Sequence, residues 1–383
     1  MQSRNRSYYT DRSSAQKRKA QRIRIWVLTG IVLVVLGIIF LMLQNVGSST
    51  EMTAIRLTCL SSQAVTPFGN NVLYYDGVSI HCLSSNGAIR WSYTVGSDAS
   101  FACSDTHIAI WIGNQLYFVD QNGHPTYNEA LSGNIQFARV GKQYVAVVLG
   151  SDTSPELSVK DLQGSQIDEE TEAFKNTFML DMGFFGDNGE NLWTLAMDIY
   201  GTTMNTMLNT FQVGKMNTGV VSLGEKPAYS ILFENKRLRV FTTQQLLTFD
   251  YKAVQDTNDT RLVYGWEHIG TFIPERGDAA MLLAPTTQTG SNKSLSDLRV
   301  IQGNNDRRYT LPGPCVGADV VNNSIYGFSS RYIFRSDIAT QRFYPYAIPL
   351  PEGENVTAYL GMTKDNHALL ACGETVYSVN LPE

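Results

Sequence analysis

The chain has 383 residues, of which 43% are hydrophobic and 17% are charged, and its formal net charge is −5. This composition supports a large buried core and excludes an intrinsically disordered chain. Residues 1–24 carry eight basic side chains and one acidic one, so their +7 leaves −12 for the rest of the chain. So acidic a remainder does not favour nucleic acid or anionic lipid as a partner.

The N-terminal region predicts a membrane anchor. Residues 25–43 contain no charged side chain, and Thr29 is their one polar residue. As a helix these residues would rise about 28 Å, close to the roughly 30 Å hydrocarbon core of a bilayer. Because basic flanks stay on the cytoplasmic side, we expect a signal anchor with its N-terminus inside the cell. The alternative is a cleaved signal peptide, whose apolar region usually spans only about 7–15 residues.

After a linker over 44–53, the sequence repeats itself. The segment 105–120 aligns without gaps with 365–380, and 71–85, 235–250 and 323–337 follow the same frame. Four residues of the first segment, Asp105, His107, Gly113 and Tyr117, are matched by Asp365, His367, Gly373 and Tyr377. Repetition at this spacing is typical of repeat architectures.

Each repeat alternates apolar and polar residues over short strands that are separated by Gly-containing turns. We therefore predict an all-β fold over 54–383, a β-propeller of about eight four-stranded blades, with seven as the alternative. The ring has no open edge only if the two chain ends share a sheet, so 54–60 should pair with the C-terminal strands. The predicted blades are 63–95, 99–131, 134–168, 178–223, 228–270, 271–311, 315–350 and the shared last one.

The stretch around Asp120 contains Asn122, Gly123, His124 and Tyr127 and at first looks like a place for chemistry. Its equivalents recur along the chain, with Trp91 and Tyr344 at the position of Tyr127. Because Asn-Gly is a hairpin turn and Asp can cap local backbone N–H groups, the sequence predicts a structural turn here.

Two of these units, "CLSSNGAIRW" (82–91) and "FVDQNGHPTY" (118–127), resemble the PQQ-like repeat. That repeat occurs in quinoprotein dehydrogenases and in the lipoprotein B subunit of the bacterial outer-membrane assembly machine. With its basic tail and anchor, the whole chain looks like a family of signal-anchored propeller proteins from clostridial Gram-positive bacteria. The resemblance implies the fold far more than a function. Quinoprotein dehydrogenases use adjacent cysteines, which this chain lacks, so we expect no cofactor.

No linear motif predicts a catalytic or metal site. The five cysteines, which we expect to be buried free thiols, are Cys59, Cys82, Cys103, Cys315 and Cys372. The five histidines have no metal-ligand spacing, and His107 and His367 occupy equivalent strand-entry positions. The segment 186–193 resembles the Asp-box of sialidases, and we interpret it as a hairpin turn.

Loop length suggests where a partner binds. Long connections between second and third strands are predicted at 149–157, 198–207 and 284–297, and all connections of this class emerge on one face of a propeller. The candidate interaction residues in these loops are Ser151, Asp152, Thr153, Tyr200, Thr202, Met204, Asn205, Thr286, Thr287, Gln288, Asn292 and Lys293.

The function that we predict is a plasma-membrane protein whose propeller lies outside the cell as a scaffold for an envelope protein or polymer. Membrane lipid would be contacted through residues 25–43. One alternative is a propeller enzyme that acts on an envelope glycan at the central channel. A second alternative is a transmembrane sensor that signals through its basic tail.

Overall fold

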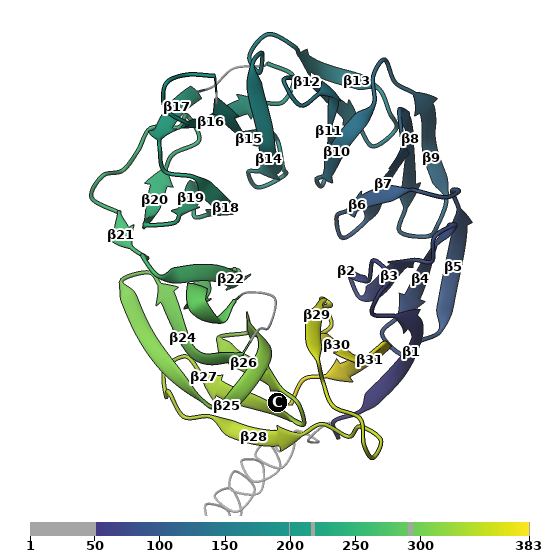
Figure 1. The fold of residues 1–383 in the computed structure, drawn as a ribbon, viewed down its shortest axis with the longest axis vertical. Helices are drawn as coiled ribbons and strands as arrows, with labels where there is room; N and C mark the ends of the chain where they lie inside the picture. Colours follow the sequence, from purple (N-terminus) through teal and green to yellow (C-terminus); the bar gives the residue numbers. More distant parts are fainter. Residues whose placement is uncertain (1–50, 199, 216–218, 290–293, 383) are drawn as a thin grey trace, which may run out of the picture. The chain divides into compact units, whose positions relative to one another are not determined.

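The computed structural model describes residues 51–198, 200–215, 219–289 and 294–382. These residues form strands and one 3₁₀ turn, η1 (Thr286–Gln288), and they contain no α-helix. Met52–Pro382 form one compact unit, in which the sheets follow one another in a ring (Figure 1). The predicted tail, membrane span and most of the linker lie outside the described residues. Within the described ranges, no helix is long and apolar enough to cross a membrane.

Four antiparallel sheets of four strands form the first half of the ring. In chain order they comprise β2 (Thr66–Phe68), β3 (Asn71–Tyr75), β4 (Ser79–Ser84) and β5 (Ile89–Thr94); β6 (Ser100–Cys103), β7 (His107–Ile112), β8 (Gln115–Asp120) and β9 (Pro125–Ala130); β10 (Ile135–Val140), β11 (Tyr144–Ser151), β12 (Ser154–Asp161) and β13 (Gln166–Glu170); and β14 (Thr177–Phe185), β15 (Asn191–Asp198), β16 (Asn205–Gln212) and β17 (Gly219–Gly224).

Three further sheets complete the unit. They comprise β18 (Ala228–Glu234), β19 (Arg237–Thr242), β20 (Gln245–Phe249) and β21 (Arg261–Leu262); the seven strands β22 (Trp266–Phe272), β23 (Ala280–Pro285), β24 (Leu295–Gln302), β25 (Asn305–Val321), β26 (Ser324–Ser329), β27 (Tyr332–Asp337) and β28 (Tyr344–Ala347); and β29 (Ala358–Met362), β30 (His367–Cys372), β31 (Thr375–Asn380) and β1 (Ala54–Leu60).

The seven-stranded sheet owes its size to one long strand. The first part of β25 pairs with β24, where Gln302 lies opposite Asn305. Its last part pairs with β26, where Val321 lies opposite Ser324. One continuous strand is therefore shared by two groups of four strands.

The two chain ends share a sheet, as the sequence predicted. β1 runs antiparallel to β31, and Ala54 lies opposite Val379. The Thr53 backbone N–H also donates a hydrogen bond of 2.6 Å to the Asn380 Oδ1 atom. Because β1 covers the edge of β31, the sheet formed by the chain ends has four strands, like the others around the ring.

Four predicted segments, 63–95, 99–131, 134–168 and 178–223, coincide with four sheets to within three residues. The boundary predicted at 270/271 is wrong, because β22 begins at Trp266 and pairs with β23 in the next sheet. The preceding strand β21 has only two residues, so the chain leaves its sheet earlier than the repeat length suggested. The Asp-box-like segment is a hairpin turn between β14 and β15, as predicted.

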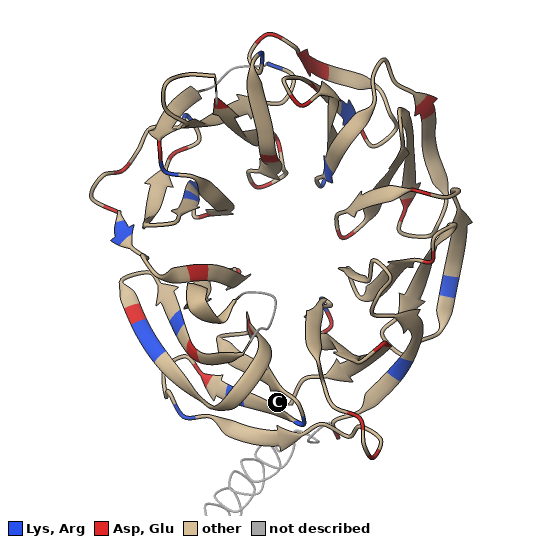
Figure 2. Ribbon diagram, viewed as in Figure 1, with Lys and Arg blue, Asp and Glu red and all other residues tan. Residues whose placement is uncertain are grey.

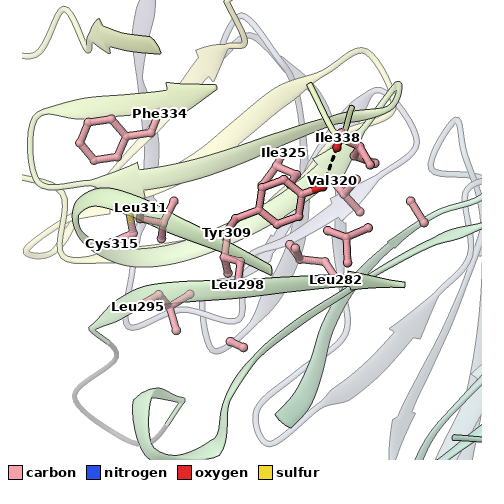
Figure 3. Packing of buried hydrophobic residues seen from close by; sticks show 14 residues of the cluster. Leu282, Leu295, Leu298, Tyr309, Leu311, Cys315, Val320, Ile325, Phe334 and Ile338 are labelled. Atoms are coloured by element: carbon pink, nitrogen blue, oxygen red, sulfur yellow. Dashed lines mark hydrogen bonds between the residues drawn. The ribbon is translucent and has the colours of Figure 1, made fainter. Parts of the chain in front are cut away.

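Apolar side chains pack between neighbouring groups of four strands around the ring, including the two groups within the seven-stranded sheet. The largest cluster joins β23–β25 to β26 and β27 and includes Leu298, Tyr309 and Ile325 (Figure 3). The Tyr309 hydroxyl is buried but donates a 2.7 Å hydrogen bond to the Ile338 carbonyl oxygen. A buried phenol needs such a partner, so the Tyr309 hydroxyl is not left as an unsatisfied donor in this core.

The Asp120 turn is structural, as the sequence predicted. One carboxylate oxygen of Asp120 accepts hydrogen bonds from the backbone N–H groups of Asn122 and His124, each 2.8 Å long. The same arrangement recurs at Asp161 and Asp250. Each carboxylate therefore closes a tight turn between the third and fourth strands of its sheet.

These turns also join neighbouring sheets. The Tyr127 ring on β9 lies against the next turn, and a Cβ at Gly164 would come within 1.8 Å of that ring. Likewise the Trp91 indole Nε1–H donates to the Gln121 carbonyl oxygen at 2.9 Å. The predicted equivalent Tyr344 is about half exposed, and its ring faces Arg342. The repeated Gly and aromatic residues thus serve packing between sheets.

Candidate interaction surface

One face of the ring carries the connections between the second and third strands of each sheet, and we call it the loop face. Sheets that are antiparallel and equivalent around a ring place this connection at the same end. The connections between successive sheets reach the same face. For example, the Asn176 N–H donates to the Thr153 carbonyl oxygen, and the Thr286 N–H donates to the Gly265 carbonyl oxygen, at 3.0 Å each.

The first candidate loop differs from its prediction. Residues 149–151 and 154–157 are paired strands, and Ser151 lies opposite Ser154. Only Asp152 and Thr153 remain as a tight hairpin tip, so the long connection predicted at 149–157 is wrong. Within this hairpin Gly150 lies opposite Pro155 and has a φ of +86°, a backbone conformation that favours glycine. The side chains of this tip are exposed.

The second candidate loop is a true connection between β15 and β16. Tyr200 and Met204 are 59% and 56% exposed, which is unusual for large apolar side chains. The Tyr200 N–H donates to the Asp198 carboxylate at 2.9 Å, which fixes the start of the loop. Thr202 is exposed, whereas Asn205 begins β16 and accepts a 2.6 Å hydrogen bond from the Ser222 hydroxyl.

The third candidate loop joins β23 to β24. Thr286, Thr287 and Gln288 form η1, whereas Asn292 and Lys293 lie outside the described residues. The Gln288 side chain folds back, because its Oε1 accepts from the Ser296 N–H at 2.9 Å. Gln288 thereby becomes part of the wall of a pocket.

That pocket, which we call the Trp266 cleft, has a volume of about 440 Å³. Its lining residues are Trp266, Pro285, Gln288, Asp297, Arg308, Tyr309 and Thr310. The Arg308 and Arg299 guanidinium carbons lie 5.5 and 5.9 Å from the centre of the Trp266 ring. Both distances are typical of cation–π contacts, so two guanidinium groups contact the Trp266 indole, and the one that lines the cleft belongs to Arg308.

The sheet that precedes the Trp266 cleft in the chain has a short outer strand. β21 has two residues, whereas the outer strands β5, β9, β13 and β17 have five or six. The Arg299 guanidinium donates to the Leu262 carbonyl oxygen at 3.0 Å, which places β21 beside the cleft. Next to it, Leu262 and Tyr264 are 68% and 74% exposed. Sequence reasoning missed this cleft, because its residues come from separate strands and share no motif.

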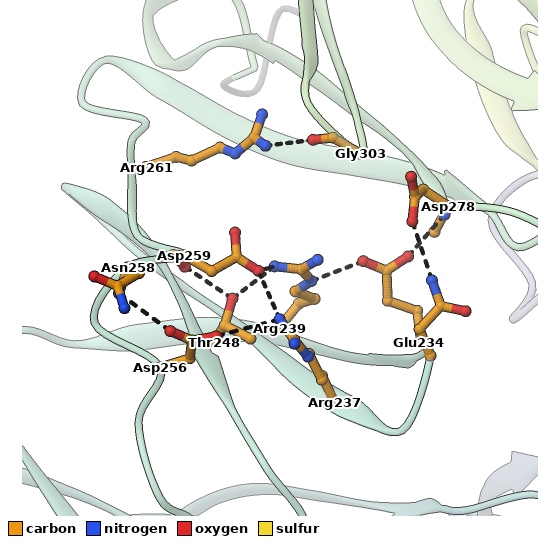
Figure 4. Close-up of polar contacts among 12 residues, drawn as sticks. Glu234, Arg237, Arg239, Thr248, Asp256, Asn258, Asp259, Arg261, Asp278 and Gly303 are labelled. Atoms are coloured by element: carbon orange, nitrogen blue, oxygen red, sulfur yellow. Dashed lines mark hydrogen bonds and ion pairs between the residues drawn. The ribbon is translucent and has the colours of Figure 1, made fainter.

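A network of charges takes the place of the missing strand pairing (Figure 4). Arg239 donates to the buried Glu234 carboxylate at 2.7 Å and to the Thr248 hydroxyl at 2.6 Å, and it also contacts Asp259. Burial opposes ionisation of Asp259, but the charge and hydrogen bond of Arg239 lower its pKa. The other Glu234 oxygen accepts from the Ala279 N–H at 2.7 Å, so the network reaches the next sheet.

Charge around the ring is otherwise mixed. Figure 2 shows Lys and Arg scattered over several sheets rather than gathered in one of them. A nucleic-acid site needs a continuous basic stripe along the backbone of its ligand. That nucleic acid is not a partner stays a prediction. The scattered Lys and Arg residues agree with it.

An acidic side chain near the central channel, that of Asp319, is hydrogen-bonded to a tyrosine. Asp319 on β25 accepts a 2.5 Å hydrogen bond from the Tyr359 hydroxyl on β29. Burial raises the pKa of Asp319, although this hydrogen bond opposes the effect. A Cβ at Gly270 would lie 2.7 Å from the Asp319 carboxylate, so three strands converge here.

The partly buried His268 should make stability depend on pH. His268 stacks on Phe241 with ring centres 4.4 Å apart, and its nitrogens contact the Ser230 and Thr271 hydroxyls at 2.9 and 2.6 Å. Burial lowers the pKa of His268 from 6.5 to about 4. As the pH falls, the unfolded chain binds this proton at a higher pH than the folded protein does. The contribution of neutral His268 to the free energy of unfolding is therefore complete above pH 6.5 and is lost as the pH falls towards 4.

We expect the free energy of unfolding to contain a His268 contribution that is about 2 kcal/mol smaller at pH 5 than at pH 7. His268→Gln should remove this part of the pH dependence in urea unfolding at the two pH values. His124→Gln is the control, because the His124 side chain is 76% exposed. An equal pH dependence in wild type and His268→Gln would contradict the assignment.

Other titratable groups form no metal centre in the part of the chain that the structure describes, where no three His, Cys, Asp or Glu side chains converge. Cys59, Cys82, Cys315 and Cys372 are buried, as predicted, whereas Cys103 is only partly buried; all five are unpaired. His107 and His367 begin equivalent strands and face Asp120 and Asn380, which confirms their equivalence. The predicted absence of a cofactor and of a catalytic residue stays a prediction.

Comparison with known proteins supports the fold. No protein-family model and no curated relative matches this sequence. Among solved structures, BamB from Moraxella catarrhalis is similar at a TM-score of 0.53 and 11% identity, covering 86% of this chain and 98% of that one. Sqt1 from Saccharomyces cerevisiae is similar at a TM-score of 0.57 and 10% identity, covering 86% and 100%. At such identities the likeness concerns fold alone, and with the ring of antiparallel sheets it defines a β-propeller.

Proposed function

We propose that this protein is a membrane-anchored, extracytoplasmic β-propeller that binds a protein of the cell envelope through its loop face. One observation supports the proposal most directly: exposed side chains and the Trp266 cleft lie on the same face, the loop face. Tyr200 and Met204 present apolar area there, and Trp266 and Arg308 belong to the residue types that dominate binding energy in protein interfaces. A rigid ring that holds such groups suits a scaffold.

The anchor in this proposal rests on the sequence of residues 1–43. Eight basic residues precede an uncharged apolar run, which favours a cytoplasmic N-terminus and an exterior propeller at the plasma membrane. Membership of a family of signal-anchored propellers from clostridial bacteria is part of the same proposal. The ten residues 44–53 reach at most about 35 Å, so the ring would stay close to the bilayer surface.

In the same proposal the propeller has eight blades. The seven-stranded sheet would contribute two of them, with β25 as the outer strand of one and the inner strand of the next. The six four-stranded sheets, including the one that β1 completes, would supply the others.

Crosslinking in intact cells tests the function. We would add a membrane-impermeant crosslinker to cells that express the full-length protein and identify the captured proteins by mass spectrometry. The proposal predicts specific envelope proteins, which are lost when 200–204 and 286–293 are replaced by Gly-Ser sequences of equal length. Absence of labelling by the impermeant reagent would contradict the exterior location.

A matched control changes the opposite face. Asn122, Gln163 and Lys252 lie at exposed turn tips away from the loop face, and their joint replacement by Ser should leave capture unchanged. Thermal unfolding midpoints of all variants distinguish lost binding from lost folding. If both sets of variants capture the same proteins as wild type, the loop face is not the binding surface.

An enzyme at the central channel is the second candidate, and the raised pKa of Asp319 favours it. A carboxyl group with a raised pKa holds its proton to a higher pH than an ordinary one, and it could donate that proton to a substrate. Glycan hydrolysis uses two carboxyl groups about 5–10 Å apart, whereas the observation here concerns one acid, so the scaffold remains our proposal. An Asp319→Asn variant that abolished turnover of an envelope glycan by the full-length protein would reverse this choice.

A further inference from the structure

We propose that the Trp266 cleft binds an extended peptide segment of a protein partner, in which one Asp or Glu side chain is flanked by an apolar one. The proposal rests on the scaffold function and names the chemistry of its partner. Arg308 would hold the carboxylate, and Leu262 and Tyr264 would contact the apolar neighbour. The two arginines that contact Trp266, Arg299 and Arg308, have very different partners.

Arg299 is held in place by groups of the protein itself. Its guanidinium donates two hydrogen bonds to the Asp306 carboxylate, at 2.8 and 2.7 Å, and a third to the Leu262 carbonyl oxygen. Only 8% of the residue is exposed. Arg299 is therefore a structural residue, which supports the indole from a fixed position.

Arg308 is exposed and lies over the same indole. Its guanidinium forms no ion pair within the described ranges, although its charge contributes to lowering the pKa of Asp306. A guanidinium stacked on an aromatic ring loses side-chain freedom but keeps its N–H groups directed outward. The Arg308 guanidinium can therefore bind a carboxylate, which accepts two parallel hydrogen bonds from it.

Asp297 limits how much negative charge the cleft can accept. Its carboxylate already accepts from the Ser296 hydroxyl at 2.9 Å, the Thr310 hydroxyl at 3.3 Å and the Gln288 side chain at 3.4 Å. It adds a negative charge that repels a polyanion more strongly than a single carboxylate. Chain residues 25–383 also carry −12 overall. A single acidic side chain thus fits better than a phosphorylated or uronic acid polymer.

The apolar surroundings favour a protein segment. Leu262 and Tyr264 are 68% and 74% exposed; the Leu262 carbonyl oxygen accepts from Arg299, and Tyr264 lies two residues before Trp266. Interfaces between proteins are enriched in Trp, Tyr and Arg at their centres. The cleft volume of about 440 Å³ suits one or two side chains of a peptide.

The experiment measures binding of two fluorescein-labelled peptides, Gly-Ser-Leu-Glu-Leu-Ser-Gly and its Gln analogue, to the full-length protein in detergent by fluorescence anisotropy. We expect the Glu peptide to bind about tenfold or more tightly than the Gln peptide. Arg308→Gln should remove that difference, and Asp297→Asn should tighten binding of the Glu peptide. Arg308→Lys, which keeps the charge without the planar fork, should lie between wild type and Arg308→Gln.

Arg342→Gln is the matched control, because Arg342 also lies over an aromatic ring, Tyr344, at 5.2 Å. It removes the same charge outside the cleft and should leave both affinities unchanged. Equal affinity for the two peptides, no binding of either at millimolar concentration, or equal effects of Arg308→Gln and Arg342→Gln would overturn the proposal. So would displacement of the Glu peptide by polygalacturonate with higher affinity, which would indicate a glycan site instead.

The peptide-binding experiment tests the Trp266 cleft, and the crosslinking experiment tests the scaffold function, so the two proposals can fail separately. If peptides do not bind but in-cell crosslinking still captures envelope proteins, the scaffold proposal stands and the peptide site fails. If crosslinking captures nothing while the peptides behave as expected, the cleft binds acidic peptides but the exterior scaffold is wrong.

Discussion

Arg239→Met should lower the free energy of unfolding by about 3–5 kcal/mol, the cost of leaving a buried charge without its partner. The Glu234 side chain is 2% exposed and that of Arg239 is 11% exposed, and they are 2.7 Å apart. After the substitution, the Glu234 carboxylate keeps the Ala279 N–H but has lost its counter-ion. Urea unfolding at pH 7 measures the change.

Arg237→Met is the control for this variant. Arg237 lies two residues away, is 47% exposed, and contacts Asp256 and Asp259 at 3.3 Å each. Exposed ion pairs contribute about 0–1 kcal/mol, so this variant should remain close to wild type. Replacing both Glu234 and Arg239 by Met should recover much of the loss, since no buried charge then remains. Equal, small effects of Arg237→Met and Arg239→Met would show that the network does not stabilise the fold.

Leu57→Ala should lower the free energy of unfolding by about 2–5 kcal/mol, because it removes a core side chain from the strand that closes the ring. Leu57 is 3% exposed and packs with residues of two sheets, among them Val72, Leu83 and Leu369. The loss would be large only if β1 is firmly paired with β31. Urea unfolding of the full-length protein provides the measurement.

Leu60→Ala supplies the comparison within the same strand. Leu60 is 43% exposed, so its substitution should change stability by no more than about 0.5 kcal/mol. If the two leucine variants are equally stable, β1 does not contribute its side chain to the core, and closure of the ring by the two chain ends would be contradicted.

The turns were predictable because each depends on residues close together in sequence. Asp120 binds backbone groups two and four residues ahead, so Asp, Asn and Gly at fixed spacing were sufficient to predict it. Alternation of apolar residues likewise predicted the strands of the first four sheets. The pairing of 54–60 with the C-terminal strands followed from the requirement that a ring leave no open edge.

Predictions made from local sequence failed where the structure depends on pairing with a distant strand. The polar residues of 149–157 suggested a loop, yet their backbone is paired almost to the tip. The repeat length placed a boundary at residue 270, but two-residue β21 ends its sheet early. Pairing between strands, which depends on the partner strand, decided both cases.

The sequence by itself determined the repeating strands, the Asp-capped turns and the closure of the ring, since these follow from short-range hydrogen bonding and from the alternation of apolar side chains. Only the tertiary structure decided where a surface could bind. Trp266 and Arg308 are 42 residues apart in the chain, and they meet because β22 and β25 belong to one sheet beside a shortened outer strand. Contacts of this kind depend on which strands become neighbours, and no local pattern encodes that choice.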